Sequence, residues 1–256
     1  MTDESDMQES GEQSLVSHLV ELRDRLLRCV LSIAVCFIPL YAFANELYAA
    51  VSEPLRAALP PNATMIATNV ASPFLAPFKL TLFTAFFVAV PYILYQIWSF
   101  IAPALYQKEK GFAIPLLITS VLLFYAGVAF AYFVVFPLAF AFFASTSPEG
   151  VAMMTDINSY LDFILKMFFA FGVAFEIPVA TILLLKTGLT SIASLKEKRP
   201  YIIVGCFVVG MVLTPPDVIS QTLLAVPMWL LYEAGIFFAR HLGIEGSASD
   251  EQPSTP

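Results

Sequence analysis

The chain has few charged residues, and this shortage excludes a soluble globular protein. Only 13% of its 256 residues are Asp, Glu, Lys or Arg, whereas soluble domains average about 25%. It also lacks the GxxxxGK[ST], GxSxG and HExxH patterns, so ATP-driven transport and the commonest hydrolase reactions have no motif. Hydrophobic residues make up 59% of the chain, which indicates a polytopic membrane protein.

Cysteine and histidine are equally scarce. The three cysteines, Cys29, Cys36 and Cys206, lie in apolar runs without a CxxC pair or a His/Cys cluster. We therefore expect small hydrophobic side chains, with no disulfide framework, no metal site and no cofactor. Both histidines, His18 and His241, lie outside the apolar runs, which excludes a histidine proton relay inside the membrane.

Six apolar runs provide the candidate membrane spans. A helix needs about 20 residues to cross a hydrocarbon core of about 30 Å, and the fifth run has only 13. We expect this run to be re-entrant, or to thin the bilayer locally together with the sixth. The sequence therefore predicts an all-α polytopic membrane protein with six transmembrane helices, whose short fifth and sixth spans form a hairpin. The runs are 26–44, 78–101, 112–144, 163–185, 201–213 and 218–239.

Basic residues predict the orientation of these spans. With a cytoplasmic N-terminus, only Arg56, Lys79 and Lys166 of the 13 Lys and Arg residues fall at the outer side. The positive-inside rule then places both termini in the cytoplasm. The polar ends, residues 1–14 and 241–256, contain too little apolar surface to fold, so we expect disordered tails around a membrane domain of residues 15–240. Without a basic patch, we expect no nucleic-acid partner.

An acid lies near the middle of the fourth run. A charge at such a depth costs roughly 2.5–3.5 kcal/mol, so Glu176 is expected to face a cavity, a partner or a functional site. Gly172 and Pro178 should weaken the helical turn around it. An acid that is merely hydrogen-bonded inside the bundle is the alternative interpretation. Asp217 follows two prolines and is suited to cap the sixth span, with Gln221 one turn further along the same face.

Two further acids have simple local interpretations. Glu21 lies four residues before Arg25, a spacing typical of a surface ion pair on a helix. Both belong to residues 15–28, an amphipathic stretch that we expect to lie on the membrane surface. Glu109 lies between two lysines in the loop after the second run, where local chemistry alone indicates a solvated charge.

Seven sequence blocks within residues 15–240 indicate a protein family, which the spacing of single residues does not. In chain order they are HLVELRDRLL, MIATNVASPF, FIAPALY, FYAGVAFAYFVVFPLAF, FGVAFEIPVA, KRPYIIVGCFVVGMVLTPPD and SQTLLAVPM. Together they resemble the TatC family, the polytopic core of the bacterial twin-arginine protein translocase. The resemblance implies a receptor and scaffold in the cytoplasmic (inner) membrane, which exports folded proteins by using the proton-motive force and is not an enzyme.

The resemblance also implies a binding site for the cargo. In the family two cytoplasmic acids bind the arginine pair of the twin-arginine signal peptide, and the matching blocks put these acids at Glu21 and Glu109. Carboxylates suit this task because Arg offers a planar bidentate fork that Lys lacks. Arg23 and Phe100 would support the same surface.

Partners inside the membrane are implied as well. They are two single-span proteins, TatA and TatB, together with lipid and further copies of the chain in a receptor complex. Glu176 would line the concave face of a glove-like bundle, and Thr214 and Gln221 would lie in the partner-binding groove of the fifth and sixth spans. The implied functional positions in the outer loops are Pro54, Phe74 and Asp217.

Two other classes of function remain open from the residues themselves. Glu176 also suits a proton-coupled transporter of a small solute, since broken helices often mark transport sites. Against this, the 33-residue third run has no counterpart in the 22-residue sixth, so no internal repeat is evident. An intramembrane hydrolase would need a nucleophile with a base within reach. Replacing Glu21 and Glu109 by Ala separates receptor from transporter, because only a receptor would lose cargo binding.

Overall fold

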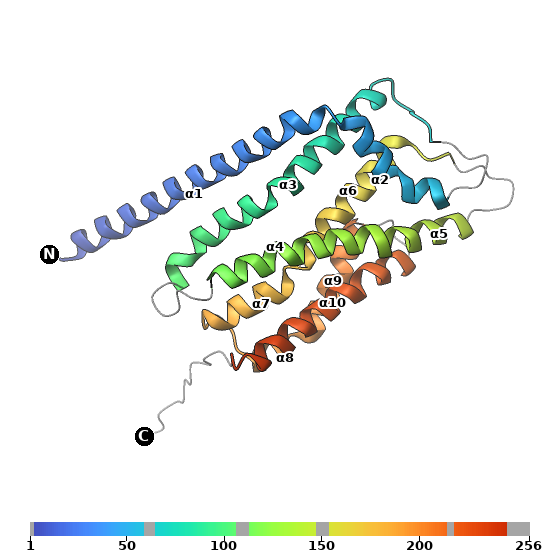
Figure 1. The fold of residues 1–256 in the computed structure, drawn as a ribbon. Helices are drawn as coiled ribbons and strands as arrows, with labels where there is room; N and C mark the ends of the chain where they lie inside the picture. The colour runs from blue at the N-terminus through green and yellow to red at the C-terminus, as the bar shows by residue number, and fades with distance from the viewer. Residues whose placement is uncertain (1–2, 59–64, 106–112, 147–153, 214–217, 245–256) are drawn as a thin grey trace. The chain divides into compact units, whose positions relative to one another are not determined.

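The computed structural model describes residues 3–58, 65–105, 113–146, 154–213 and 218–244. Helices account for nearly all of the regular structure in these ranges, in the order shown in Figure 1. A single bridge pairs Ile66 with Asp156. The prediction of an all-α fold is confirmed.

Four helical segments within the described ranges are long and apolar enough to cross a membrane. A fifth candidate is a pair of helices, His18–Tyr41 and Ala44–Glu53, which meet at a 90° bend. The short apolar helix α9 (Arg199–Leu213) has 15 residues, as expected for the fifth run. The chain is therefore a multi-pass membrane protein. The four segments are Ser72–Phe100, Ile114–Thr146, Ile157–Lys186 and Gln221–His241.

The sixth run differs from our expectation of a short span. It forms α10 (Val218–His241), a helix of 24 residues, which at about 1.5 Å per residue is long enough for a full crossing. Pro227 lies inside this helix without ending it. Only the fifth of the two expected short spans is therefore short.

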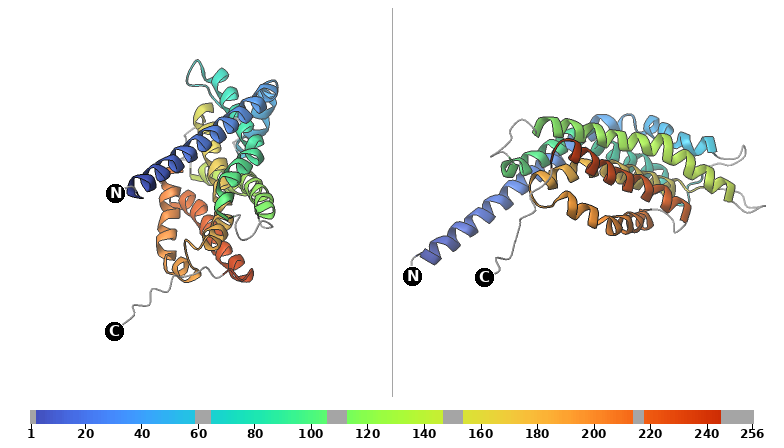
Figure 2. Two further views of the ribbon diagram at one scale, coloured as in Figure 1. Left: turned by 90° about the vertical axis from the view of Figure 1, so that its left-hand side faces the viewer. Right: turned by 90° about the horizontal axis from the view of Figure 1, so that it is seen from below.

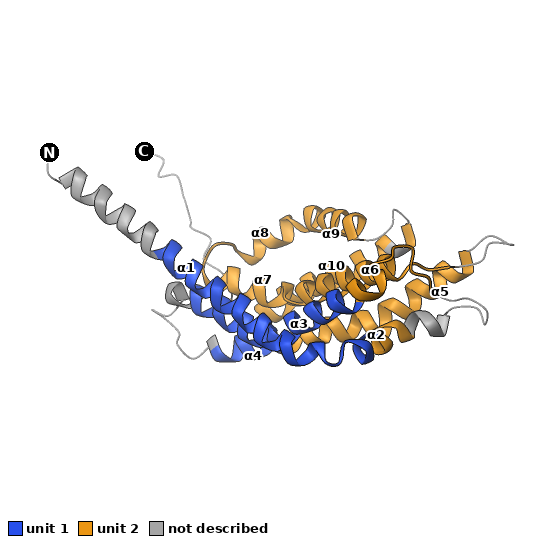
Figure 3. Ribbon diagram, turned by 90° about the horizontal axis from the view of Figure 1, so that it is seen from above, with its two compact units in different colours: residues 1–48, 77–121 blue, residues 49–76, 122–256 orange. Residues whose placement is uncertain are grey.

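The chain forms two compact units, residues 1–48 with 77–121 and residues 49–76 with 122–256 (Figure 3). In the first unit, α1 (Asp3–Tyr41) is one helix of 39 residues (Figure 2). We expected residues 15–28 to form a separate helix on the membrane surface. They continue instead into the apolar run, because no Gly or Pro occurs between residues 15 and 38 to end the helix.

The first unit also contains most of α3 (Ser72–Leu105). Aromatic packing joins it to α1, since the ring centroids of Phe37 and Phe78 lie 5.2 Å apart in an edge-on arrangement. Further along α3, the buried Trp98 donates from Nε1 to Ser120 Oγ at 3.4 Å. Ser120 belongs to α4 (Ala113–Phe130). The second contact gives the N–H of a buried indole ring a hydrogen-bond acceptor.

In the second unit the helical path is modified next to two prolines. A π-helical turn, η1 (Ala131–Val135), separates α4 from α5 (Phe136–Thr146) and ends just before Pro137. Proline removes a helical donor and its ring disfavours a regular α-turn before it, and a π-turn relieves such a conflict. The turn directs Tyr132, whose hydroxyl donates to the Ala50 carbonyl of α2 (Ala44–Ala58) at 3.1 Å.

The second of these prolines is Pro178, which lies at the weak turn predicted in the fourth run. The run forms α6 (Ile157–Ala174) and α7 (Ile177–Lys186), with Phe175 and Glu176 at the break and Pro178 in the first turn of α7. Proline has no N–H to donate to the carbonyl four residues earlier, so the α-helical ladder is interrupted there. The expectation of a weakened turn at Glu176 is confirmed.

Close helix packing in the second unit depends on two glycines. A Cβ on Gly127 would lie 2.3 Å from the Phe171 carbonyl oxygen, and one on Gly235 would lie 2.9 Å from Pro178 Cα. Any larger residue at these positions would push the helices apart. Gly235 thus allows α10 to lie directly against α7, and this contact adjoins a core of Leu185, Leu195, Tyr232, Ile236 and Ala239.

Candidate functional site

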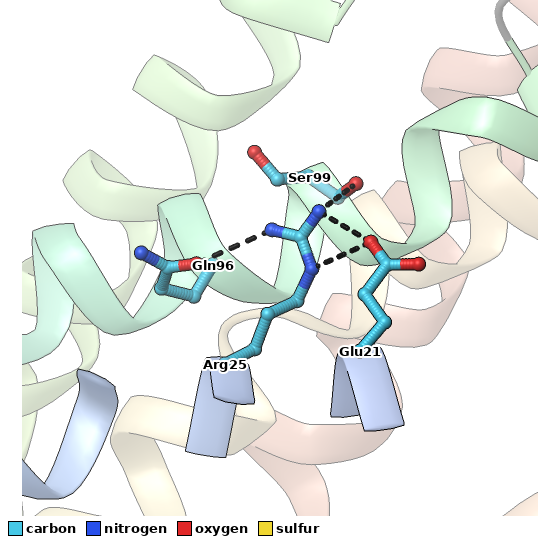
Figure 4. Close-up of polar contacts among 4 residues, drawn as sticks. All are labelled: Glu21, Arg25, Gln96 and Ser99. Atoms are coloured by element: carbon cyan, nitrogen blue, oxygen red, sulfur yellow. Dashed lines mark hydrogen bonds and ion pairs between the residues drawn. The ribbon is translucent and has the colours of Figure 1, made fainter. Parts of the chain in front are cut away.

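A group of four residues joins α1 to the later part of α3 in the first unit (Figure 4). We call Glu21, Arg25, Gln96 and Ser99 the α1–α3 polar cluster. The Arg25 guanidinium donates from Nε and Nη2 to Glu21 Oε1 at 2.9 and 2.6 Å. It also donates from Nη1 to Gln96 Oε1 and from Nη2 to the Ser99 carbonyl, both at 3.2 Å. One cation therefore fixes two helices to each other.

Local sequence explains why the Ser99 carbonyl accepts this bond. In an α-helix it would accept from the N–H four residues later, but that position is Pro103, which has no N–H. A carbonyl left without its helical donor needs another donor when it is removed from water. Arg25 provides that donor, so the proline of the FIAPALY block prepares the contact between α3 and α1.

The two oxygens of Glu21 have different surroundings. Both bonds from Arg25 end on Oε1, while Oε2 lies on the side away from the guanidinium (Figure 4). Within the described part of the chain, no donor reaches Oε2. The Glu21 side chain is 41% exposed and that of Arg25 only 20%. The carboxylate is thus held at one oxygen by a sheltered cation, on a side chain that is itself partly exposed.

Two of the other three residues predicted for the cargo site, Arg23 and Phe100, lie on the same two helices as this cluster. Phe100 packs against His18 with ring centroids 4.5 Å apart, a second contact between α1 and α3. Arg23 pairs with its neighbour Asp24 at 2.8 Å and is largely exposed. Glu109 lies outside the described residues, ten positions after Ser99. The structure thus places Phe100 against His18 of α1 and leaves Arg23 at the surface.

The predicted intramembrane residues lie in the second unit. Glu176 is half-buried at the break between α6 and α7, with Oε1 shielded from solvent. Gln221 donates from Nε2 to the Phe207 carbonyl at 3.0 Å and so ties α10 to α9. A cavity of about 200 Å³ lies between the same two helices, lined by apolar atoms of Ile203, Phe207, Ala225, Val226 and Trp229. Thr214 lies outside the described residues.

The predicted outer-loop residues are not brought together by the described chain. Pro54 belongs to α2, and Phe74 is exposed in the first turn of α3. Asp217, for which we also expected a capping role, lies outside the described residues.

A polar junction that sequence reasoning missed lies at the start of α6. Asp156 accepts from the backbone N–H and hydroxyl of Thr68 on Oδ1, at 3.1 and 2.8 Å. Its Oδ2 accepts from the N–H and hydroxyl of Ser159, at 3.1 and 3.2 Å. These four donors, led by the Thr68 hydroxyl, lower the pKa of Asp156 to about 2. The position of Asp156 before a helix is a signal for capping that the sequence contains. Its bond to Thr68, 88 residues away, has no signal in the sequence.

A further missed contact pairs two charged residues of the second unit. Arg199, at the start of α9, donates from Nη2 to Glu233 Oε2 on α10 at 2.5 Å. Neither spacing nor composition connects these two residues, which lie 34 positions apart in the sequence. Among the described residues no group of three or more His, Cys, Asp or Glu side chains has the geometry to hold a metal ion.

Comparisons with known proteins extend over nearly the whole chain. The family model described as Sec-independent protein translocase protein (TatC) matches residues 17–227. The TatC of Azotobacter chroococcum mcd 1 is 66% identical over 243 residues, covering 94% of this chain and 95% of that protein. The TatC of Escherichia coli K12 is 57% identical over 239 residues, covering 93% of each.

A solved structure gives the same result. A crystal structure described as the twin arginine translocase receptor TatC has a TM-score of 0.79 and 37% identity, covering 88% of this chain and 99% of that one. Sequence and fold therefore agree over the same residues. The chain belongs to the TatC family of Sec-independent protein translocase proteins.

Proposed function

We propose that the chain is the signal-peptide receptor and core scaffold of a twin-arginine translocase, and that Glu21 binds an arginine of the cargo's signal peptide. The observation that carries this proposal is the divided environment of the Glu21 carboxylate. Arg25 holds one oxygen, and within the described residues no donor bonds the other, on a side chain that is 41% exposed. The solved relative is described as a twin arginine translocase receptor.

Two arginines need two acceptors. Glu109 is the second acid of the proposed site, and in the sequence it follows four residues after the end of α3, the helix to which Arg25 fixes Glu21. Carboxylates separate Arg from Lys because the guanidinium presents planar paired donors, whereas an ammonium is a compact point charge. Phe100 offers an apolar surface next to Glu21, and Arg23 is available to an acidic group of the cargo or a partner.

The membrane arrangement follows from the same proposal. Both termini lie in the cytoplasm, the chain crosses the bacterial cytoplasmic membrane six times, and the proton-motive force drives export of the folded cargo. The single-span partners TatA and TatB dock along the fifth and sixth spans, where Thr214 and Gln221 lie, with Glu176 lining the concave face. Pro54, Phe74 and Asp217 act at the outer side.

Site-specific photocrosslinking tests the receptor assignment. A photoreactive residue in place of Gln107, which leaves Glu109 intact, is combined with a radiolabelled signal peptide that carries either Arg-Arg or Lys-Lys. We expect a crosslink with the Arg-Arg peptide that is strongly reduced with Lys-Lys and is lost in Glu21→Ala. The matched control is Glu197→Ala, which removes an exposed acid from α8 (Ile192–Glu197). Equal crosslinking of both peptides would show proximity without recognition and would contradict the proposal.

A further inference from the structure

The guanidinium of Arg25 is the best-connected charged group in the α1–α3 polar cluster. It makes four hydrogen bonds, two to Glu21 Oε1, one to Gln96 Oε1 and one to the Ser99 carbonyl. Two of these acceptors belong to α3, and Gln96 is buried. The position of the cation is therefore determined by α3, although its side chain starts on α1.

This fixed cation determines how the Glu21 carboxylate is presented. A glutamate on an exposed helix face has several accessible rotamers, and ordering such a side chain costs free energy through lost rotamer freedom. Bonding through Oε1 orients the carboxylate before any ligand arrives and leaves Oε2 on the side away from the guanidinium (Figure 4). A ligand that needs a defined carboxylate geometry benefits from this preorganisation.

The same cation also weakens a purely electrostatic attraction to Glu21. Arg25 compensates the carboxylate charge at close range, so a ligand that offers only a positive charge gains little. A ligand that offers directed donors still gains hydrogen bonds to Oε2. Orientation and charge compensation therefore act in the same direction, toward a guanidinium and against an ammonium group.

We propose that Arg25 is a positioning residue that gives the receptor its preference for arginine over lysine, by fixing the carboxylate of Glu21 from α3. The inference rests on the proposed function, because it assigns the specificity of that site. Arg25 acts through Glu21, and Gln96 with the Ser99 carbonyl acts through Arg25.

The test compares peptide binding by full-length variants in lipid nanodiscs. Affinities for synthetic Arg-Arg and Lys-Lys signal peptides are measured for wild type, Arg25→Gln, Gln96→Leu and Arg28→Gln. Arg28→Gln is the matched control, since it removes an exposed arginine one turn further along α1. In Arg25→Gln we expect the Arg-Arg over Lys-Lys preference to fall about tenfold, the equivalent of one charge-assisted bond. In Gln96→Leu we expect a fall of about threefold, and in Arg28→Gln no change.

A merely structural role for Arg25 would lower both affinities together and leave their ratio unchanged, which would overturn the inference. An equal loss of preference in Arg28→Gln would also overturn it, because net charge rather than position would then be responsible. If Arg25→Gln fails to fold, Gln96→Leu decides alone, since it changes only α3. A wild-type protein without any preference for Arg-Arg would refute the proposed function itself, whereas a preference that survives in Arg25→Gln refutes only the inference.

Discussion

Two carboxylates in this protein are held by hydrogen bonds, and they are held in different ways. Asp156, in the second unit, has both oxygens occupied by neutral donors from Thr68 and Ser159. Among the described residues, Glu21 in the first unit is bonded at one oxygen only, by the charged side chain of Arg25. The first arrangement consumes the acceptor capacity of the acid, and the second orients it while leaving capacity for a ligand.

The difference separates a structural acid from a candidate binding acid. Asp156 pairs with Ile66 in the isolated bridge, bonds Thr68 close to it, and caps α6. Its loss should therefore affect stability. Glu21 contributes one weak surface ion pair to folding, so its loss should affect binding. Exposure alone would not separate the two residues, because both lie at least partly at the surface.

The largest expected effect is on binding in Glu21→Gln. The substitution keeps the size of the side chain but removes the charge, so the affinity for an Arg-Arg peptide should fall about a hundredfold, from the loss of charge-assisted hydrogen bonds. Equilibrium binding to the protein in nanodiscs measures this. Asp156→Asn is the control and should bind with wild-type affinity. If both variants lose binding equally, the distinction between the two acids is wrong.

A smaller effect, on stability, is expected for Glu233→Gln. Its partner Arg199 would lose a charge-assisted bond between α9 and α10. Because both side chains are partly exposed, the loss should be about 1 kcal/mol, which lowers the midpoint of thermal unfolding by about 2–4 °C. Glu197→Gln, at an exposed position on α8, should leave the midpoint unchanged. Reduced peptide binding in Glu233→Gln would show that this acid resembles Glu21 rather than Asp156.

The hydroxyl of Tyr160 should contribute slightly less to stability than the Arg199–Glu233 ion pair does. It donates to the Val51 carbonyl at 2.7 Å and joins α6 to α2 close to Asp156. Tyr160→Phe should lower stability by about 0.5–1 kcal/mol, as measured by thermal unfolding. Tyr201→Phe is the control, because Tyr201 is exposed. A loss of peptide binding with unchanged stability would contradict the structural role of this region.

The smallest expected effect is the response of the Asp156 junction to pH. The pKa of Asp156 is lowered from 3.8 to about 2 in the folded chain. A lowered pKa means that the stabilisation is fully present above about pH 4 and is lost as the pH falls toward 2. The difference in unfolding midpoint between wild type and Asp156→Asn should therefore stay constant from pH 8 to pH 5 and shrink below pH 4. A change between pH 7 and pH 5 would contradict this.

Features determined along the chain were predictable from the sequence. The apolar runs fixed the helical class, the shortage of charge fixed the membrane location, and Pro178 with Gly172 fixed the break at Glu176. The 13-residue run gave the short helix α9. Where prediction was wrong, two adjacent segments are joined, because residues 15–28 continue into the first span as one helix. The length of a helix depends on where it is interrupted, and hydropathy does not define this.

The sequence by itself determined which acids exist, that Glu21 and Arg25 share a helix face, and that Pro103 leaves the Ser99 carbonyl without a helical donor. Only the tertiary structure decided how those groups are used. Gln96 lies 71 residues from Arg25, and Thr68 lies 88 from Asp156. Hydrogen bonds act over about 3 Å, so the assignment of donors to each carboxylate oxygen depends on which helices pack together. Periodicity and composition describe one helix at a time and carry no information about that pairing.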